Sequence, residues 1–529
     1  MAAGDADEND SVTSGPAHTE DDSGGSSRLP SRIPTFDDVP LTDEQEAVLQ
    51  KARDGHNIFF TGPAGTGKSL LLRRIVHHFT AEKKMTGAEL VVTAPTGLAA
   101  ANIGGCTIHS WAGVGLHENR DIEDLLVKAI SRRRYNLLGQ LPVDVGSSTS
   151  VEDIVDPNST MERWVQCQIL IIDEVSMMHA NFFDKLEYMA RFIRRIDRPF
   201  GGIQLVVSGD FLQLPPIVAR RDDIKFAFES ETWQQCLDNS AILHEVYRQE
   251  HRGFIDVLHD LRRGIVTQRV RAFVRRHESS IDYPPGTGPT DLCAKKVAVH
   301  SMNEAGLAKL DTPSHKFIAA DEPGVDQEDG FMTPTTLELK VGACVMLVRN
   351  LVPNMLVNGS LGEVIGFDTA ANVHKSEQAW IGIPSALKDL IQAGAIQYGY
   401  QHYDEDLQKV LENKRKWPLV RFNYGAAQTV DILCVPLRFR APRAGDDLFR
   451  LQVPLTLTYA LTVHKAQGQT LERVRVDMSN MWEYGHFYVA LSRVANPDCL
   501  EIVNWEYWRV KAHPRAVAWY DELVESLET

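Results

Sequence analysis

A glycine-rich segment, Gly62 to Ser69 (GPAGTGKS), constrains this chain more than any other part of it. It follows a short apolar stretch, HNIFFT at residues 56–61, which has the length of a buried strand, and it precedes SLLLRRIVHHF, an apolar run typical of a helix. In such a turn, backbone N–H groups and the helix N-terminus can surround phosphate groups. We therefore expect Gly62, Gly65 and Gly67 to shape an ATP-binding loop, Lys68 to reach the β and γ phosphates, and Ser69 to hold Mg²⁺.

Further short apolar runs predict an α/β fold with a parallel sheet. Strand candidates lie at residues 90–94, 169–172 and 203–207, with helical sequence between them. Two stretches, 118–160 and 366–450, interrupt this alternation and are predicted to be insertions, the second with strands at 418–422 and 428–433.

The N-terminal residues 1–38 are rich in Ser, Gly, Asp and Thr and predict a disordered acidic tail. The net charge of the whole chain is −16, but residues 1–40 hold nine acidic and only two basic residues and so carry −7 of it. The remaining negative charge does not exclude binding of nucleic acid, because a local basic track along a channel is sufficient. No apolar run approaches the roughly 20 residues that span a bilayer, and we expect no membrane association.

Two more strand ends carry polar side chains that suit ATP hydrolysis. ILII at 169–172 is followed by Asp173, predicted to hold Mg²⁺, and by Glu174, predicted to orient the attacking water. The strand at 203–207 is followed by SGDFLQLPP, in which Gln213 can sense the γ-phosphate. An acidic strand end or a loop glutamine is common by itself, so the prediction of ATP hydrolysis depends on the order of the three motifs along the chain.

Several segments, in order along residues 41–520, resemble the motifs of the Pif-one (petite integration frequency) helicases of superfamily 1, group B. These segments are LTDEQ at 41–45, TAPTGLAAANIGGCTIHSWAG at 93–113, LHEVYRQEHRGFIDVLHDLRRG at 243–264, LKVGACVMLVRN at 339–350, LVNGSLGEVIGF at 356–367, LTLTYALTVHKAQGQTLE from 455 and GHFYVALSRV from 485. The resemblance implies two RecA-like motor domains, at 39–240 with the insertion 118–160 and at 241–529 with the insertion 366–450. It also implies that the second insertion forms a small SH3-like β barrel.

The same resemblance implies roles for single residues. Arg248 and Arg493 would act as arginine fingers on the γ-phosphate, although a lone arginine is more often a surface ion-pair partner. Gln45 would read the adenine edge, and Gln467 and Gly468 would lie near the nucleotide. Contacts to a DNA strand are expected from Thr96, His109, His464 and Lys465, while for the two histidines a structural role is an equal alternative.

The implied function is that of an ATP-dependent DNA helicase, which moves 5′ to 3′ on single-stranded DNA and unwinds forks, duplexes or G-quadruplex structures in replication, repair, recombination and telomere maintenance. The alternative is a P-loop ATPase that acts as a nucleic-acid remodeller or switch, and RNA stays open as a track. We expect a monomer in the nucleus, with mitochondrion and cytoplasm as alternatives.

Overall fold

The computed structural model describes residues 40–114, 120–140, 159–218, 220–283, 288–323, 331, 333–349, 351, 356, 358–376, 380–381, 414–424, 428–440 and 449–528. The predicted tail 1–38 lies outside these residues, as do parts of both predicted insertions. Among the described helices, none has the length and apolar character that crossing a membrane requires.

The first lobe is built on a parallel sheet with the strand order β3-β2-β4-β5-β1-β6. Its strands β1, β4 and β5 are almost wholly buried, as expected of apolar runs covered on both faces. The predicted parallel α/β fold is therefore confirmed. The strands are β1 (Ile58–Thr61), β2 (Leu90–Ala94), β3 (Cys106–Thr107), β4 (Ile169–Ile172), β5 (Gln204–Ser208) and β6 (Asn239–Ile242).

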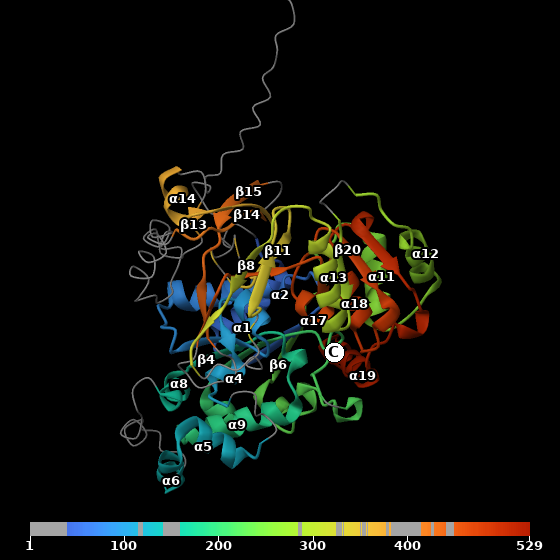
Figure 1. Cartoon of the computed structure of the whole chain (residues 1–529). Helices are drawn as coiled ribbons and strands as arrows, with labels where there is room; N and C mark the ends of the chain where they lie inside the picture. Colours follow the sequence, from blue (N-terminus) through green and yellow to red (C-terminus); the bar gives the residue numbers. More distant parts are fainter. Residues whose placement is uncertain are drawn as a thin grey trace, which may run out of the picture.

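Helices surround this sheet, and those of the 118–160 region extend away from the second lobe (Figure 1). α5 and α6 of that region pack against each other and against α9. The helices of the first lobe are α1 (Asp43–Arg53), α2 (Lys68–His77), α3 (Gly97–Asn102), α4 (Ile108–Trp111), α5 (Ile122–Ile130), α6 (Arg132–Gln140), α8 (Thr160–Gln166), α9 (Ala180–Arg194) and α10 (Trp233–Cys236).

The second lobe has its own parallel sheet, in the order β19-β7-β20-β21. Its core joins these strands to the apolar faces of α11 and α18. The strands are β7 (Thr290–Cys293), β19 (Ala460–Thr462), β20 (Val474–Asp477) and β21 (Leu500–Val503), and the helices are α11 (Arg252–Arg262), α12 (Gln268–His277), α13 (Lys296–Ala308), α17 (Val463–Ala466) and α18 (His486–Leu491).

Between β7 and β19 the chain forms mainly antiparallel sheets, which lie at one end of the molecule (Figure 1). These strands begin at residue 315, so the departure from the parallel sheet starts well before residue 366, and the limits 366 and 450 stay a prediction. The SH3-like form of this part also stays a prediction. The elements are β8 (His315–Ile318), β9 (Ala320–Asp321), β10 (Thr336–Leu339), β11 (Cys344–Leu347), β12 (Leu361–Asp368), α14 (Ala370–Ser376), β13 (Trp380–Ile381), β14 (Trp417–Tyr424), β15 (Gln428–Leu433), β16 (Leu437–Arg440), β17 (Phe449–Gln452) and β18 (Leu455–Leu457).

The last helix, α19 (Pro514–Glu528), returns to the first lobe, although the sequence places it in the second half. Ala516 is buried in the core of the first lobe, and the Trp519 ring stacks on Phe228 at 4.5 Å and meets Phe211 edge-on at 5.1 Å. The physical reason is that the aromatic side chains of this helix are partly buried against aromatic rings of the first lobe. The division at residues 240 and 241 therefore does not separate the lobes in space.

Candidate nucleotide site and strand contacts

The glycine-rich loop lies between β1 and α2, and its glycines are needed for their backbone shape. Gly67, the N-cap of α2, has φ +79°, and a Cβ there would lie 2.6 Å from Gln45 Nε2. Gly65 has φ +91°, and a Cβ there would lie 2.8 Å from Arg248 Cβ. Both positions combine a left-handed backbone with close neighbours, so only glycine fits without strain.

Gln45 lies beneath this loop rather than out in solvent. Its side chain is buried, and Nε2 donates a hydrogen bond of 3.1 Å to the carbonyl of Thr66. With Thr42 it also forms the capping box that begins α1. The structure thus brings Gln45 to the P-loop, while its reading of the adenine edge stays a prediction.

The Lys68 ammonium lies inside the loop. Nζ donates hydrogen bonds to the carbonyl oxygens of Gly62 at 2.7 Å and Pro63 at 3.0 Å. Burial lowers the pKa of Lys68, while the charges of Asp210 and Glu174 oppose that shift. A half-buried cation whose hydrogen bonds, among the described residues, go to carbonyl oxygens of its own loop suits an anionic ligand at this place.

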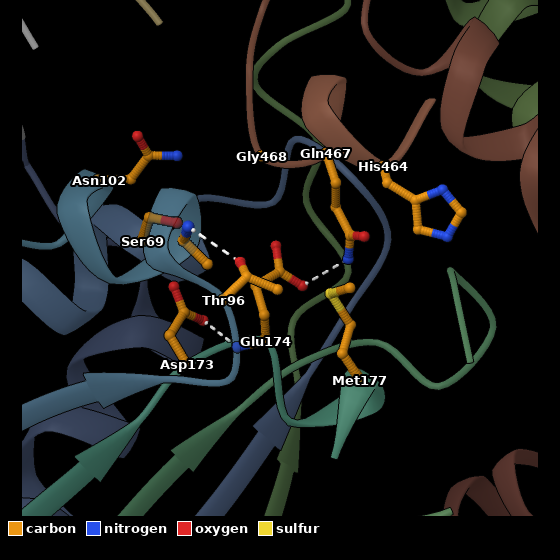
Figure 2. Close-up of a pocket in the computed structure, with 10 residues that line it drawn as sticks. Ser69, Thr96, Asn102, Asp173, Glu174, Met177, His464, Gln467 and Gly468 are labelled. Atoms are coloured by element: carbon orange, nitrogen blue, oxygen red, sulfur yellow. Dashed lines mark hydrogen bonds between the residues drawn. The ribbon is translucent and has the colours of Figure 1, made fainter. Parts of the chain in front are cut away.

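The carboxylates Asp173 and Glu174 meet Ser69 in one pocket (Figure 2). Asp173 Oδ1 accepts hydrogen bonds from the Ser208 hydroxyl and from the backbone N–H of Glu174. Burial raises the pKa of Asp173, and burial together with the neighbouring Asp173 raises the pKa of Glu174 to about 7. Two buried carboxylates with raised pKa values are typical of a site that receives a cation.

The second lobe reaches directly into this pocket. Gln467, which follows α17, donates a hydrogen bond of 3.0 Å from Nε2 to Glu174 Oε2 (Figure 2). Within the described residues, Gln467 Oε1 is buried without a hydrogen-bond partner. Gly468 has φ +79° and lines the same pocket. The predicted proximity of Gln467 and Gly468 to the nucleotide pocket is thus seen in the geometry.

Gln213 lies where the first lobe meets the second. Its Nε2 donates a hydrogen bond of 3.2 Å to Asp210 Oδ2, and its carbonyl oxygen is 2.3 Å from where a Cβ on Gly485 would be. The sequence prediction did not use Asp210 as a site residue, and it did not single out Arg262, whose guanidinium forms a buried ion pair with Asp210. The signals for them were that Asp210 lies two residues after β5, and that Arg262 lies in the segment 243–264, which resembles the family's arginine-bearing motif joined to its signature.

The two predicted arginine fingers lie side by side in the interior. Arg248 Nη1 donates a hydrogen bond of 3.0 Å to the carbonyl of Ser492, and Arg493 Nε donates one of 2.8 Å to the carbonyl of Val489. Burial, reinforced by the charge of Arg248, lowers the pKa of Arg493 to about 9. Arg493 is only 1% exposed, so the alternative of a surface ion pair is wrong for this residue. A buried and a half-buried cation that repel each other favour an anion between the lobes.

The residues predicted to contact a strand fall in different places. Thr96 and His464 line the pocket, and the Thr96 hydroxyl also accepts a hydrogen bond of 3.2 Å from Ala99 N at the start of α3. The His109 ring, in contrast, stacks on Phe182 at 4.5 Å. Burial lowers the pKa of Lys465, which the charge of Lys296 lowers further. Their strand contacts stay predictions.

His464 has a partner that the sequence did not indicate. Its Nε2 lies 3.3 Å from Glu483 Oε2, and the same oxygen lies 2.8 Å from His486 Nε2. The carboxylate of Glu483 therefore joins α17 to α18. This contact gives His464 a structural role in addition to any contact with a ligand.

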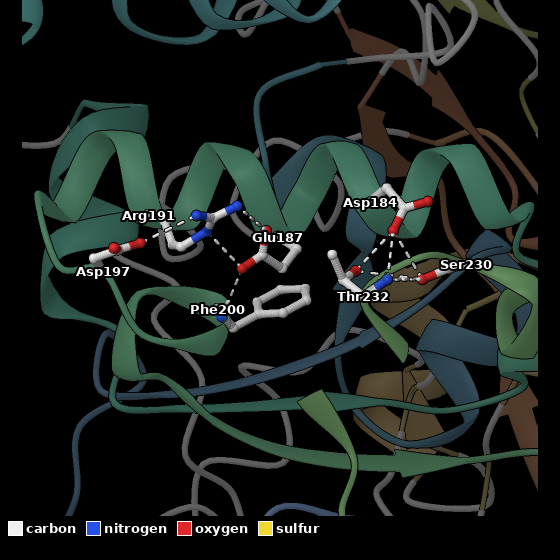
Figure 3. A network of polar contacts seen from close by, with 7 residues as sticks. All are labelled: Asp184, Glu187, Arg191, Asp197, Phe200, Ser230 and Thr232. Atoms are coloured by element: carbon white, nitrogen blue, oxygen red, sulfur yellow. Dashed lines mark hydrogen bonds and ion pairs between the residues drawn. The ribbon is translucent and has the colours of Figure 1, made fainter. Parts of the chain in front are cut away.

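A network on α9 supports the strands that carry the site (Figure 3). Glu187 is buried and accepts hydrogen bonds from Arg191 and from the backbone N–H of Phe200. Phe200 lies within the turn Pro199–Gly202 just before β5 and has φ +50°, so the buried Glu187 carboxylate holds a strained backbone position. Asp184, one turn away on the same helix, accepts hydrogen bonds from the hydroxyls of Ser230 and Thr232.

The donor set fits ATP and Mg²⁺. Lys68, Arg248 and Arg493 supply positive charge around the loop, and Ser69 and Asp173 supply oxygen ligands of the kind that Mg²⁺ prefers. The amide oxygen of Gln467, which has no hydrogen-bond partner among the described residues, would gain one from the bound group.

Comparison with known proteins agrees with this geometry. The family model "PIF1-like helicase" matches residues 40–141 and 133–271, and the model "DNA helicase Pif1, 2B domain" matches residues 329–367. The ATP-dependent DNA helicase RRM3 of Saccharomyces cerevisiae is 35% identical over 520 residues, which cover 92% of this chain and 68% of that protein. The chain belongs to the PIF1-like helicases.

Other members of this family agree in sequence and in fold. The ATP-dependent DNA helicase PIF1 of Homo sapiens is 33% identical and is covered over 64% of its length, so the chain spans less than two thirds of that protein. The crystal structure of the Pif1 helicase from Candida albicans has 34% sequence identity and a TM-score of 0.71, with 92% of this chain and 100% of that chain covered. A Bacteroides Pif1 structure with ADP-AlF3 and single-stranded DNA, at 21% identity and a TM-score of 0.59 with 92% and 98% covered, supports the fold.

Proposed function

We propose that the chain is an ATP-dependent DNA helicase that uses ATP hydrolysis between its two lobes to move along single-stranded DNA. The observation that carries this proposal is the contact of Gln467 with Glu174, because it joins a motif of the second lobe to the carboxylate proposed to position water. A nucleotide bound in that cleft is contacted by both lobes, so its hydrolysis can change how they sit together.

The chemistry of the proposed reaction follows from the placement of the side chains. Mg²⁺ held by Ser69 and Asp173 would neutralise charge on the phosphates. Glu174 orients a water molecule whose oxygen attacks the γ-phosphorus, and the bond from phosphorus to the β,γ-bridging oxygen breaks. The proton of the water passes toward Glu174, and Lys68, Arg248 and Arg493 stabilise the charge on the phosphoryl oxygens.

Binding of DNA by related proteins favours the helicase over a switch ATPase. The relatives carry the name ATP-dependent DNA helicase, and Bacteroides Pif1 structures include single-stranded DNA and forked double-stranded DNA. We extend DNA binding to this chain, with Thr96, His109, His464 and Lys465 as the first candidates for contacts. Movement from 5′ to 3′, action on G-quadruplex DNA, a monomeric state and location in the nucleus are further parts of the proposal.

Steady-state ATP hydrolysis with and without single-stranded DNA tests the proposal directly. A motor should hydrolyse ATP faster when single-stranded DNA is added, whereas a switch that does not use DNA as its track should not respond. Duplexes with a 5′ or a 3′ single-stranded tail then separate the polarities, and unwinding of the 5′-tailed duplex alone is expected. Lys68→Ala serves as the hydrolysis-dead control, because it removes a phosphate-binding cation. Stimulation by DNA without unwinding of either duplex would favour the remodeller.

A further inference from the structure

A buried ion pair crosses between the lobes beside the nucleotide pocket. Asp210 lies two residues after the end of β5 of the first lobe, and Arg262 is the last residue of α11 in the second. Arg262 Nε donates to Asp210 Oδ2 at 3.0 Å and Nη2 donates to Oδ1 at 2.8 Å, while the two side chains are 5% and 0% exposed. A two-point contact of this kind fixes both distance and orientation.

The same carboxylate holds the side chain predicted to sense the γ-phosphate. Asp210 Oδ2 accepts the hydrogen bond from Gln213 Nε2, and Asp210 Oδ1 accepts one of 3.1 Å from the backbone N–H of Leu212. The position of the Gln213 amide therefore depends on Asp210, whose own orientation depends on Arg262.

The helix α19 also contacts Arg262, in addition to the contact of Arg262 with Asp210. The Arg262 guanidinium lies 4.3 Å from the centre of the Tyr520 ring, which belongs to α19. Arg263, the next residue, forms an ion pair of 2.7 Å with Asp521. That second pair is exposed, with the side chains 38% and 43% accessible, so it contacts the same helix without reaching the pocket.

We propose that Arg262 is a positioning residue for ATP hydrolysis. Arg262 orients the Gln213 amide through Asp210, so the orientation of Gln213 depends on the packing of α11 and α19. The inference rests on the proposed function, because it concerns the rate of that hydrolysis. The contacts of Arg262 are with Asp210 and the Tyr520 ring, so it acts on the reaction through other residues. Its effect passes through the carboxylate of Asp210, which belongs to the first lobe and pairs with Arg262 of the second.

The test uses the full chain with Arg262→Gln and Asp210→Asn combined. This double variant removes both charges, so neither is left buried and unpaired, and its thermal unfolding should stay near that of the wild type. We expect kcat for DNA-stimulated ATP hydrolysis to fall about 10- to 100-fold, the scale of a misplaced catalytic group, with little change in KM for ATP. Adding Gln213→Ala should lower kcat by no more than a further factor of about two, because groups that act as a unit are not additive.

Two further variants separate positioning from simple stability. Arg262→Lys keeps the charge but not the two-point contact, so it should fold normally and still lose most of kcat. Arg263→Ala breaks the neighbouring exposed pair and should keep the kcat of the wild type.

A folded double variant or Arg262→Lys with the kcat of the wild type would overturn the proposal. So would a full, multiplicative effect of Gln213→Ala in the double variant. If the wild type itself lacks DNA-stimulated hydrolysis, the proposed function has failed instead, and the two failures are thereby distinguishable.

Discussion

Tyr488 of the second lobe accepts a hydrogen bond of 2.8 Å, at its hydroxyl, from the backbone N–H of Ala64 in the P-loop. Both groups are buried, so the contact ties α18 to the loop that surrounds the phosphates. α18 also leads directly to Arg493. The position of the P-loop and the position of Arg493 are therefore linked through one short helix.

Tyr488→Phe should weaken this link without emptying the core. The change leaves the Ala64 N–H without its acceptor, at a cost of about 1 kcal/mol, so KM for ATP should rise roughly fivefold. Steady-state hydrolysis at varied ATP measures this. Tyr507→Phe, at an exposed tyrosine of the same lobe, is the control and should change nothing. An unaltered KM in Tyr488→Phe would show that the contact does not contribute to nucleotide binding.

Glu174→Gln should keep binding and lose turnover. The amide has the size of the carboxylate and can still accept the hydrogen bond from Gln467, but it cannot take up a proton. We expect hydrolysis to fall by about 10² or more while fluorescent ATP analogues and single-stranded DNA still bind. Glu245→Gln, at an exposed position, is the matched control. Loss of binding together with turnover would contradict the role given to Glu174.

Arg493→Ala should act on the chemical step. An arginine finger contributes roughly 10³-fold or more to hydrolysis, so single-turnover rates should fall on that scale while ATP affinity changes little. DNA binding without nucleotide should persist, since phosphate contacts along a channel are distributed over several residues.

Two controls accompany this variant. Arg276→Ala removes an exposed arginine of the same lobe, 75% accessible in its side chain, and should leave the rate alone. Thermal unfolding of Arg493→Ala itself shows whether the loss reflects the fold. A folded Arg493→Ala protein with a normal single-turnover rate would refute the two-lobed active site.

The pH dependence of hydrolysis should report the carboxylate pair. With the pKa of Glu174 raised to about 7, its charged form is lost as the pH falls through that value. The ratio kcat/KM, which reports the free enzyme, should therefore decline below about pH 7.

Gln467→Ala provides the matching variant. The hydrogen bond from Gln467 lowers the pKa of Glu174, so its removal should raise this pKa and move the acid limb to higher pH. If kcat/KM of Gln467→Ala declines at the same pH as that of the wild type, a group other than Glu174 causes the decline.

Sequence patterns were sufficient to predict the parts of the site whose residues are consecutive in the chain. The strand, the glycines and the helix around Lys68 are consecutive, as are β4 with Asp173 and Glu174, so strand length and glycine spacing were enough to place them. Short apolar strands that alternate with helices likewise predicted the parallel sheet of the first lobe, because this pattern has few other solutions, while a second such sheet was implied by the family resemblance.

Which residues far apart in the sequence come into contact depends on how the helices and strands pack together. Nothing in the sequence pairs Arg262 with Asp210, Glu483 with His464 or Trp519 with Phe228, because each pair joins elements whose local patterns are complete without the other. The packing of α19 against the first lobe likewise could not be predicted from a local sequence pattern. Apolar periodicity shows that a helix buries one face, but it does not show against what, since the hydrophobic effect has no direction and the packing of both lobes together selects the partner.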